Sequence, residues 1–232
     1  MDTSAFTDKD SKKPEYRELY EENDYLTAYS LHTDLRIARD GKEAAIGSND
    51  KGGQGWDEHG QQQLDFLKSR GLLPEHKLLD FGCGTGRLAS KAVPYLNEGN
   101  YTGMDISRSG IDECLKLAND ENMAEKWPLF IYGNGTMDQV EDQQFHLIWA
   151  HSVFTHLPPE AIKAIFGNLS RMSFGEFCFT YKRSDSLRRS GLKQFQYPPS
   201  WLIATAKEFG LACGTLPHEW PAGQKTMNLR HA

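Results

Sequence analysis

The fold is decided by the stretch Leu78-Leu79-Asp80-Phe81-Gly82-Cys83-Gly84-Thr85-Gly86-Arg87, in which an apolar strand runs into three alternate glycines and then a helix. Glycines at such a junction let the backbone turn tightly and let a ligand approach without a Cβ in the way, while the next helix presents its free N–H groups. Three alternate glycines cost conformational entropy that a purely structural turn rarely justifies. We therefore interpret residues 80–86 as a ligand-binding turn.

Two residues of this turn distinguish between classes of ligand. Arg87 stands where the dinucleotide fingerprint G-x-G-x-x-G requires a small residue. Asp80 lies just before the glycines, where its carboxylate would repel a pyrophosphate but would suit an ammonium group. S-adenosylmethionine carries such a group on its methionyl moiety and NAD does not, so the turn favours S-adenosylmethionine.

A second binding element follows in Tyr101-Thr102-Gly103-Met104-Asp105-Ile106, a strand that ends in an acid. The carboxylate of Asp105 can accept hydrogen bonds from a ribose diol. Met104 and Ile106 beside it can flank an adenine ring. Asp105 alone would also be explained as a solvated strand end or as the cap of the next helix, and only its pairing with the glycine turn favours a ligand contact.

Strand and helix patterns alternate along the chain. Strands are predicted at 77–82, 101–106, 128–132, 144–150, 174–181, 211–216 and 225–231, and helices at 57–70, 86–97, 109–119, 159–171 and 199–209. Ser109 and Asp112 resemble a capping box, and Pro159 and Pro199 suit first-turn positions. The alternation predicts an α/β fold with a doubly wound, seven-stranded, mostly parallel sheet. The link 217–223 leaves no room for a crossover helix, so the last two strands should form a C-terminal antiparallel hairpin.

These motifs resemble the class I (Rossmann-like) S-adenosylmethionine-dependent methyltransferases, whose first motif is an acid followed by glycine-x-glycine-x-glycine and whose second strand ends in a ribose-binding acid. The matching residues are D-F-G-C-G-T-G at 80–86 and M-D-I at 104–106, and the resemblance extends over about 56–231. It implies S-adenosyl-L-methionine as the cofactor. The implied cofactor-binding residues are Asp80, Gly82, Cys83, Gly84, Gly86, Asp105, Ile106, Asn134 and Gly135.

The assignment of Asn134 depends on the resemblance, because the family places an acid or amide after the third strand to meet the adenine amino group. Most relatives have Asp at this position, but an amide oxygen can also accept the bond. In Gly-Asn-Gly, a loop residue with left-handed backbone geometry is an almost equally good explanation.

Composition narrows the class of partner and the compartment. The chain has 232 residues, a formal net charge of −6 and a pI near 5.8, which disfavours a protein that neutralises phosphates, so no nucleic-acid partner is expected. The four cysteines have no paired spacing, and no histidine pair has metal-ligand context, so we predict no metal. The absence of a signal peptide and of a membrane-spanning segment predicts a cytoplasmic protein without a membrane partner. Nothing in the sequence indicates an oligomeric state.

We expect two parts in the chain. Residues 1–55 form an N-terminal extension, partly disordered or acting as a lid, and 56–232 form the S-adenosylmethionine-binding domain. Residues 1 to about 24 alternate acids and bases with few apolar side chains, so most of this stretch should be mobile, although Tyr16, Tyr20 and Tyr25 could anchor part of it. Class I relatives commonly use N-terminal segments as lids, which predicts that about 16–55 order over the cofactor.

The predicted function is transfer of a methyl group to an O or N nucleophile of a small-molecule acceptor. His151 follows the apolar run of the fourth strand and is the candidate catalytic residue, as a general base or an orienting partner, although a structural cap would explain it equally well. His156 lies among apolar residues, where packing explains it. The basic run within 182–193 is interpreted as a solvated loop, with a substrate loop as the alternative. The alternative functions are a non-catalytic methyltransferase-like binding protein and an NAD-dependent oxidoreductase.

Overall fold

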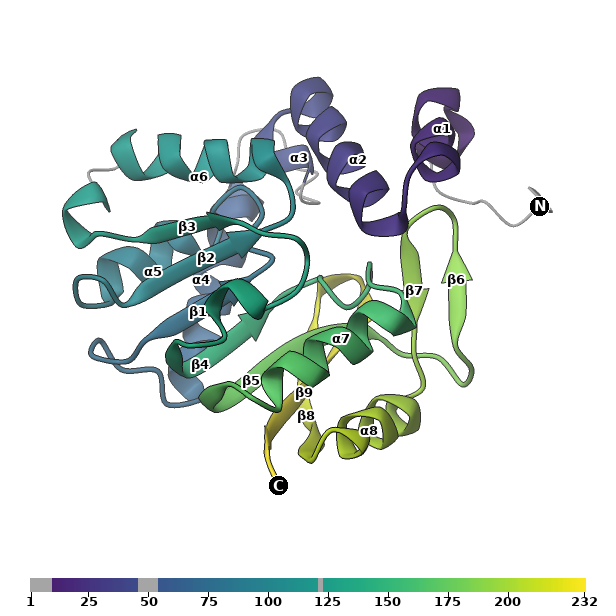
Figure 1. Ribbon diagram of the computed structural model, residues 1–232. Coiled ribbons are helices and arrows are strands. Elements are labelled where there is room, and N and C mark those ends of the chain that lie inside the picture. Colours follow the sequence, from purple (N-terminus) through teal and green to yellow (C-terminus); the bar gives the residue numbers. More distant parts are fainter. Residues whose placement is uncertain (1–9, 46–53, 121–122) are drawn as a thin grey trace. The chain divides into compact units, whose positions relative to one another are not determined.

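The computed structural model describes residues 10–45, 54–120 and 123–232 (Figure 1). Its helices are α1 (Pro14–Glu22), α2 (Tyr25–Asp40), α3 (Lys42–Ala45), α4 (Gln54–Ser69), α5 (Ala89–Tyr95), α6 (Arg108–Asp120), α7 (Pro159–Leu169) and α8 (Pro199–Glu208). The strands are β1 (Leu78–Phe81), β2 (Tyr101–Asp105), β3 (Leu129–Tyr132), β4 (Gln144–Ala150), β5 (Ser173–Lys182), β6 (Arg188–Ser190), β7 (Gln194–Gln196), β8 (Leu211–Trp220) and β9 (Gln224–His231). Short 3₁₀ turns lie at Asp10–Lys12, Met123–Lys126, Asp138–Val140 and Pro221–Gly223.

Seven of the strands form one sheet in the order β3-β2-β1-β4-β5-β9-β8, and β6 pairs with β7 in a separate two-stranded sheet. β1 runs parallel to β2 and β4, and β2 runs parallel to β3. β9 runs antiparallel to both β5 and β8. The predicted seven-stranded, mostly parallel sheet with a C-terminal antiparallel hairpin is confirmed. Because the strand order reverses at β1, the carboxyl end of β1 lies where such sheets bind ligands.

The chain divides into two compact units. Unit 1 comprises 1–29, 135–143 and 150–232, and unit 2 comprises 30–134 and 144–149. In unit 2, α6 packs on β2 and β3, and α4 packs on α5. In unit 1, α8 packs on β8 and also contacts α7.

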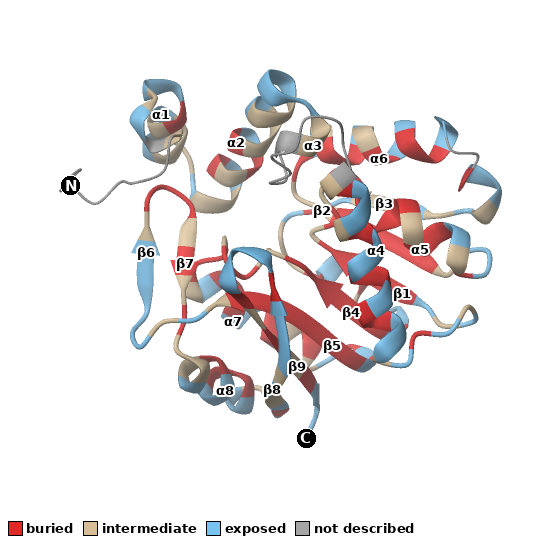
Figure 2. Cartoon of the chain, turned by 180° about the vertical axis from the view of Figure 1, so that it is seen from behind, coloured by how far each residue is buried: buried red, intermediate tan, exposed pale blue. Residues whose placement is uncertain are grey.

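The central strands of the sheet are buried. All four residues of β1 and the last four of β4 are buried, and Figure 2 shows both strands in red. Strands of a parallel sheet are covered on both faces and therefore read as continuous apolar runs. α6 buries Ile111, Cys114 and Leu117 on one face, which is the 3.6-residue period of an amphipathic helix.

The start of α6 differs from the predicted capping box. Ser107, not Ser109, precedes the helix, and its Oγ accepts the backbone N–H of Gly110 at 2.9 Å. Pro159 and Pro199 do occupy first-turn positions of α7 and α8, as predicted.

Two helix and strand bounds differ from the prediction for local reasons. α5 begins at Ala89 rather than at 86, because Gly86 has a φ of 89°, which an α-helix cannot contain. The strand predicted at 211–216 continues to Trp220 through an irregularity between Leu216 and Glu219. The intervening Pro217 lacks an N–H, and β8 tolerates it because it is the last strand of the sheet.

Five elements have no counterpart in the predicted pattern: α1, α2, α3, β6 and β7. α1 is rich in charged residues and buries Tyr16, and its few apolar residues, Tyr16, Leu19 and Tyr20, are at helical spacing within a charged stretch. Residues 1–9 and 46–53 of the predicted extension lie outside the described residues.

Candidate functional site

The glycine turn after β1 has the backbone geometry that glycine permits. Gly82, Gly84 and Gly86 have φ values of 80°, 59° and 89°, all in the left-handed region. The N–H groups of Gly82 and Cys83 both donate to the carbonyl of Met104, at 2.7 and 3.1 Å. The turn is therefore fixed to the end of β2, where the second predicted binding element lies.

Asp105 links these two elements through its side chain. Its Oδ2 accepts the N–H of Gly84 and its Oδ1 accepts the N–H of Ser107, both at 2.8 Å. Burial raises the pKa of this half-buried carboxyl, while the two backbone hydrogen bonds oppose the shift. A carboxylate offers about four acceptor positions, so about two remain for a ligand such as a ribose diol.

Asp80 lies deeper than the sequence indicated. It is 3% exposed, and its Oδ2 accepts the hydroxyl of Tyr101 at 2.7 Å. Burial is the main cause that raises the pKa of Asp80 to about 7. The hydrogen bond from Tyr101 and the charge of Arg87 lower this pKa, whereas the charge of Asp105 raises it further. Arg87 is itself buried, and burial lowers its pKa to about 10. In the sequence, Arg87 indicates only a mismatch with the dinucleotide fingerprint, whereas in the structure its charge also acts on the Asp80 carboxylate.

The predicted adenine-contact residues lie on loops. Ile106 is half-buried, and its carbonyl accepts the Oγ–H of Ser30 at 2.6 Å. Asn134 is exposed, and the preceding N–H, of Gly133, donates to the carbonyl of Asp105 at 2.8 Å. Gly135 has a φ of 83° and belongs to unit 1. The structure thus brings the loops after β2 and β3 together, while the contacts of Asn134 and Gly135 with a cofactor stay predictions.

Helix α2 supplies contacts that no local sequence pattern predicts. The Oδ1 atom of Asp34 accepts the hydroxyl of Ser107 at 2.6 Å and the N–H of Ser109 at 3.0 Å. A carboxylate at this place also stabilises the positive end of α6. Asp34 is 73 residues from Ser107 in the chain, so no local pattern could have indicated the contact.

His151, the predicted catalytic residue, is buried in unit 1 and packs edge-on against Trp220, with ring centroids 4.8 Å apart. The next residue, Ser152, has a φ of 64°, a strained value for a residue with a side chain. Its N–H donates to Thr180 Oγ1 at 2.7 Å, and its Oγ accepts from Gln224 Nε2 at 2.7 Å. These bonds hold the backbone after β4 in one conformation.

His156 has more defined surroundings than the packing role predicted for it. Its Nδ1 lies 2.8 Å from the carbonyl of Lys193, and because a carbonyl only accepts, Nδ1 carries the proton. The ring of Tyr29 stacks on the imidazole at 5.2 Å, and Tyr25 Oη donates to the His156 carbonyl at 2.7 Å. The half-buried imidazole is therefore held in one tautomer and one orientation.

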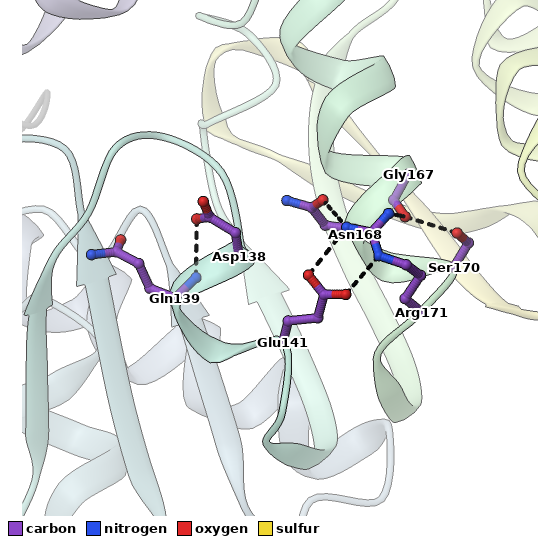
Figure 3. A network of polar contacts seen from close by, with 7 residues as sticks. All are labelled: Asp138, Gln139, Glu141, Gly167, Asn168, Ser170 and Arg171. Carbon is purple, nitrogen blue, oxygen red and sulfur yellow. Dashed lines mark hydrogen bonds and ion pairs between the residues drawn. The ribbon is translucent and has the colours of Figure 1, made fainter.

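The segment that follows Gly135 is tied to the end of α7 (Figure 3). The guanidinium of Arg171 binds both carboxylate oxygens of Glu141, at 2.6 and 3.1 Å, and also donates to Gly167 O and Asn168 Oδ1. This network fixes one end of the loop that carries a predicted adenine contact.

The described part of the chain shows neither a metal-binding cluster nor a membrane-spanning helix. There, no three His, Cys, Asp or Glu side chains gather so that they could hold a metal ion. Within the same ranges, no helix is both long enough and apolar enough to cross a membrane.

Comparison with known proteins agrees with this geometry. Residues 78–173 match the family model of a methyltransferase domain. The ribosomal protein L11 methyltransferase of Shewanella baltica (strain OS195) is 38% identical over 68 residues, which cover 29% of this chain and 22% of that protein. The chain thus spans about a fifth of the length of the curated relatives it matches.

Two solved structures share the fold. The magnesium protoporphyrin IX methyltransferase of Synechocystis PCC 6803 with bound SAM superimposes with a TM-score of 0.62 at 15% identity, covering 93% of this chain and 97% of that chain. An O-methyltransferase family protein from Burkholderia thailandensis has a TM-score of 0.62 at 12% identity, covering 94% of this chain and 70% of that chain. The family match shows a methyltransferase domain over residues 78–173, and the structural matches show that the chain has the fold of class I methyltransferases, as predicted.

Proposed function

We propose that this chain, which carries a class I methyltransferase domain, transfers the methyl group of S-adenosylmethionine to an O or N nucleophile of a small-molecule acceptor. The observation that carries the proposal is the carboxylate of Asp105, which is bonded to the glycine turn through Gly84 and keeps acceptor positions for a ribose diol. A left-handed glycine turn beside a carboxylate fits a nucleoside with an amino-acid tail better than it fits a pyrophosphate. NAD-dependent oxidation is therefore disfavoured.

When bound, S-adenosylmethionine supplies an electrophilic methyl group on its sulfonium. Asp105 would hold the ribose, the backbone of 82–86 and Asp80 would lie toward the amino-acid end, and Ile106, Asn134 and Gly135 would lie toward the adenine. His151 would face the acceptor, orienting it or taking its proton. The protein's contribution is to hold donor and acceptor in line and to exclude water.

A small-molecule acceptor is favoured by the net charge of −6, which gives the chain little attraction for a polyanion. The fourth strand ends in Ala150-His151-Ser152, without the Asn-Pro-Pro-aromatic motif of DNA-adenine and protein-glutamine methyltransferases. The ribosomal protein methyltransferase is similar to this chain over 68 residues only, so its substrate is weak evidence for the acceptor of this chain.

The N-terminal extension would cover the cofactor. α2 contacts both ends of the loop after β2, through Ser30 at Ile106 and through Asp34 at Ser107 and Ser109. Hydrogen exchange over 16–55 should slow when S-adenosylhomocysteine binds, since a lid opens less often when occupied. Equal exchange with and without the ligand would contradict this role.

The experiment that tests the proposal is calorimetric titration with S-adenosylhomocysteine, S-adenosylmethionine and NAD. The first two should bind and NAD should not. Asp105→Asn should weaken S-adenosylhomocysteine about 100-fold, because two hydrogen bonds from ribose to a charged acceptor are lost or weakened. Asp112→Asn is the matched control: Asp112 is exposed on α6, where it forms an ion pair with Arg108 at 3.5 Å. An unchanged affinity in Asp105→Asn would refute the ribose assignment.

A further inference from the structure

The segment from the end of β5 to β7 is strongly basic in an acidic chain. Residues 182–193 carry five basic side chains and one acid, whereas the whole chain has a net charge of −6. Among the described residues, only Lys193 of these five forms an ion pair, with Asp10 at 3.6 Å. The other four, Lys182, Arg183, Arg188 and Arg189, face no described carboxylate within ion-pair distance.

Arg189 differs from the others because its guanidinium is held in place. Its Nε and Nη2 both donate to the carbonyl of Leu192, at 3.2 and 2.5 Å. The guanidinium carbon lies over the rings of Tyr25, Phe195 and Tyr20, at 5.3, 5.6 and 6.0 Å from their centroids. Cation–π contacts and two hydrogen bonds thus fix the plane of a side chain that is still exposed.

A guanidinium carries five N–H donors, and Leu192 engages two of them. The remaining donors belong to a planar, permanently charged group whose orientation is already set, so a ligand would lose little entropy in ordering it. Such a fork matches the paired oxygens of a carboxylate or phosphate.

We propose that Arg189 binds an anionic oxygen group, a carboxylate or a phosphate, on the methyl acceptor. The inference rests on the proposed function, and it assigns a chemical class to the acceptor. Arg189 selects acceptors by charge, and the rings of Tyr25 and Phe195 form the apolar side of the subsite.

The neighbouring contacts place this subsite beside the segment after β4. The N–H of Phe195 donates to Thr155 O at 2.8 Å, and His156 Nδ1 donates to Lys193 O at 2.8 Å. Tyr25, which underlies Arg189, donates to the carbonyl of His156. Ligands of such sheets lie beyond the carboxyl ends of the strands, so an acid held by Arg189 is next to the segment expected to face the acceptor.

The test uses ¹⁵N-labelled protein saturated with S-adenosylhomocysteine, titrated separately with sodium benzoate and with inorganic phosphate at constant ionic strength. The Arg189 Nε–Hε resonance is identified by its loss in Arg189→Gln. In the wild type it should shift saturably with at least one probe. Affinities of the wild type and the variants are compared through backbone amide shifts, such as that of Leu192, which every variant keeps. Binding should weaken about tenfold in Arg189→Gln, as expected for loss of a charge-assisted pair of hydrogen bonds.

Arg188→Gln is the matched control, because it removes the same charge from the neighbouring residue, whose side chain points to the opposite face of β6 and donates to Ser186 Oγ at 3.3 Å. It should weaken binding less than about threefold, the effect of a screened surface charge. Arg189→Lys, which keeps the charge but not the planar fork, should also weaken binding, and it replaces Arg189→Gln if that variant does not fold.

Three results would overturn the inference. Equal weakening in Arg188→Gln and Arg189→Gln would indicate diffuse charge attraction. A lower melting temperature in Arg189→Gln with unchanged probe binding would indicate a structural clamp. Tighter binding of a single-stranded oligonucleotide than of either probe would indicate a polyanion surface. If the wild type does not bind S-adenosylhomocysteine, the proposed function itself is contradicted, and this result is distinct from the three above.

Discussion

Replacing Asp80 by asparagine should change the pH dependence of stability more than any other single substitution near the glycine turn. The carboxyl is 3% exposed and its pKa is raised from 3.8 to about 7 by burial. One pKa unit corresponds to about 1.4 kcal/mol, so ionisation of Asp80 in the folded protein costs about 4 kcal/mol relative to the unfolded chain.

The sign follows from which state holds the proton. The folded state binds the Asp80 proton more tightly than the unfolded state, so this contribution is fully present below pH 4 and is lost as the pH rises through 7. Asparagine does not titrate, and its amide oxygen can still accept the hydroxyl of Tyr101. The free energy of unfolding of Asp80→Asn, relative to wild type, should therefore rise between pH 5 and pH 8.

The same proton should couple to the cofactor. If the ammonium group of S-adenosylhomocysteine approaches the Asp80 carboxylate, as the sequence predicts, binding favours the ionised form and lowers its pKa. A decrease of one unit, from about 7 to about 6, makes the affinity rise about fivefold between pH 6 and pH 8. In Asp80→Asn the affinity should be lower and nearly independent of pH over this range.

The measurements are urea unfolding at pH 5, 6, 7 and 8, and calorimetric titration of S-adenosylhomocysteine in two buffers that differ in ionisation enthalpy. Asp112→Asn, which removes an exposed carboxylate of α6, should follow the wild-type curves. Parallel stability curves for wild type and Asp80→Asn would refute the raised pKa. A raised pKa without proton release on binding would refute only the contact with the ammonium group.

Three further predictions concern the turn, the histidines and acid stability. Gly86→Ala should lower the free energy of unfolding by about 1–3 kcal/mol, because Gly86 has a φ of 89° and an added Cβ would lie only 2.8 Å from a methyl carbon of Leu117. Gly71 has a similar φ of 91° but open space around it, so Gly71→Ala should lower the free energy of unfolding less, as measured by urea unfolding. Turnover should fall about 100-fold in His151→Ala if it is the base, with cofactor affinity unchanged; a loss in His156→Ala alone would move the role there. The pKa of His146 is lowered, first by burial and then by the stacked ring of His76, so the contribution of His146 to the free energy of unfolding is complete above its unfolded pKa and is lost as the pH falls. In His146→Asn the free energy of unfolding should therefore fall less steeply on acidification than in the wild type, and an unchanged pH profile in urea unfolding would contradict this.

The sequence predicted the central sheet because its signals are local. Apolar runs such as 78–81 and 144–150 are strands covered on both faces, and the short link after Leu216 allowed only an antiparallel return. The left-handed glycines were predictable for the same reason, since only glycine adopts that backbone at no steric cost.

The bounds near special residues were not predictable to the same degree. The helix after the turn starts later than its pattern indicates because Gly86 continues the turn, and the cap of α6 is Ser107 because Asp34 of a distant helix orients its hydroxyl. The apolar residues of α1 are few among charged ones, and β6 and β7 have three residues each, too few to show a period. Contacts within unit 1, such as that of Arg189 with Tyr20, accompany these elements.

By itself, the sequence determined the seven strands of the main sheet and the five helices from α4 onward in their order along the chain, the glycine turn and the pairing of that turn with the acid at the end of the next strand. Only the tertiary structure decided the environment of the ionisable groups. Asp80 became a buried carboxyl beside Tyr101, and Arg189 became a fixed guanidinium over three rings. The physical reason is that backbone periodicity depends on neighbours in the chain, whereas desolvation and pairing depend on side chains that folding brings together from distant positions.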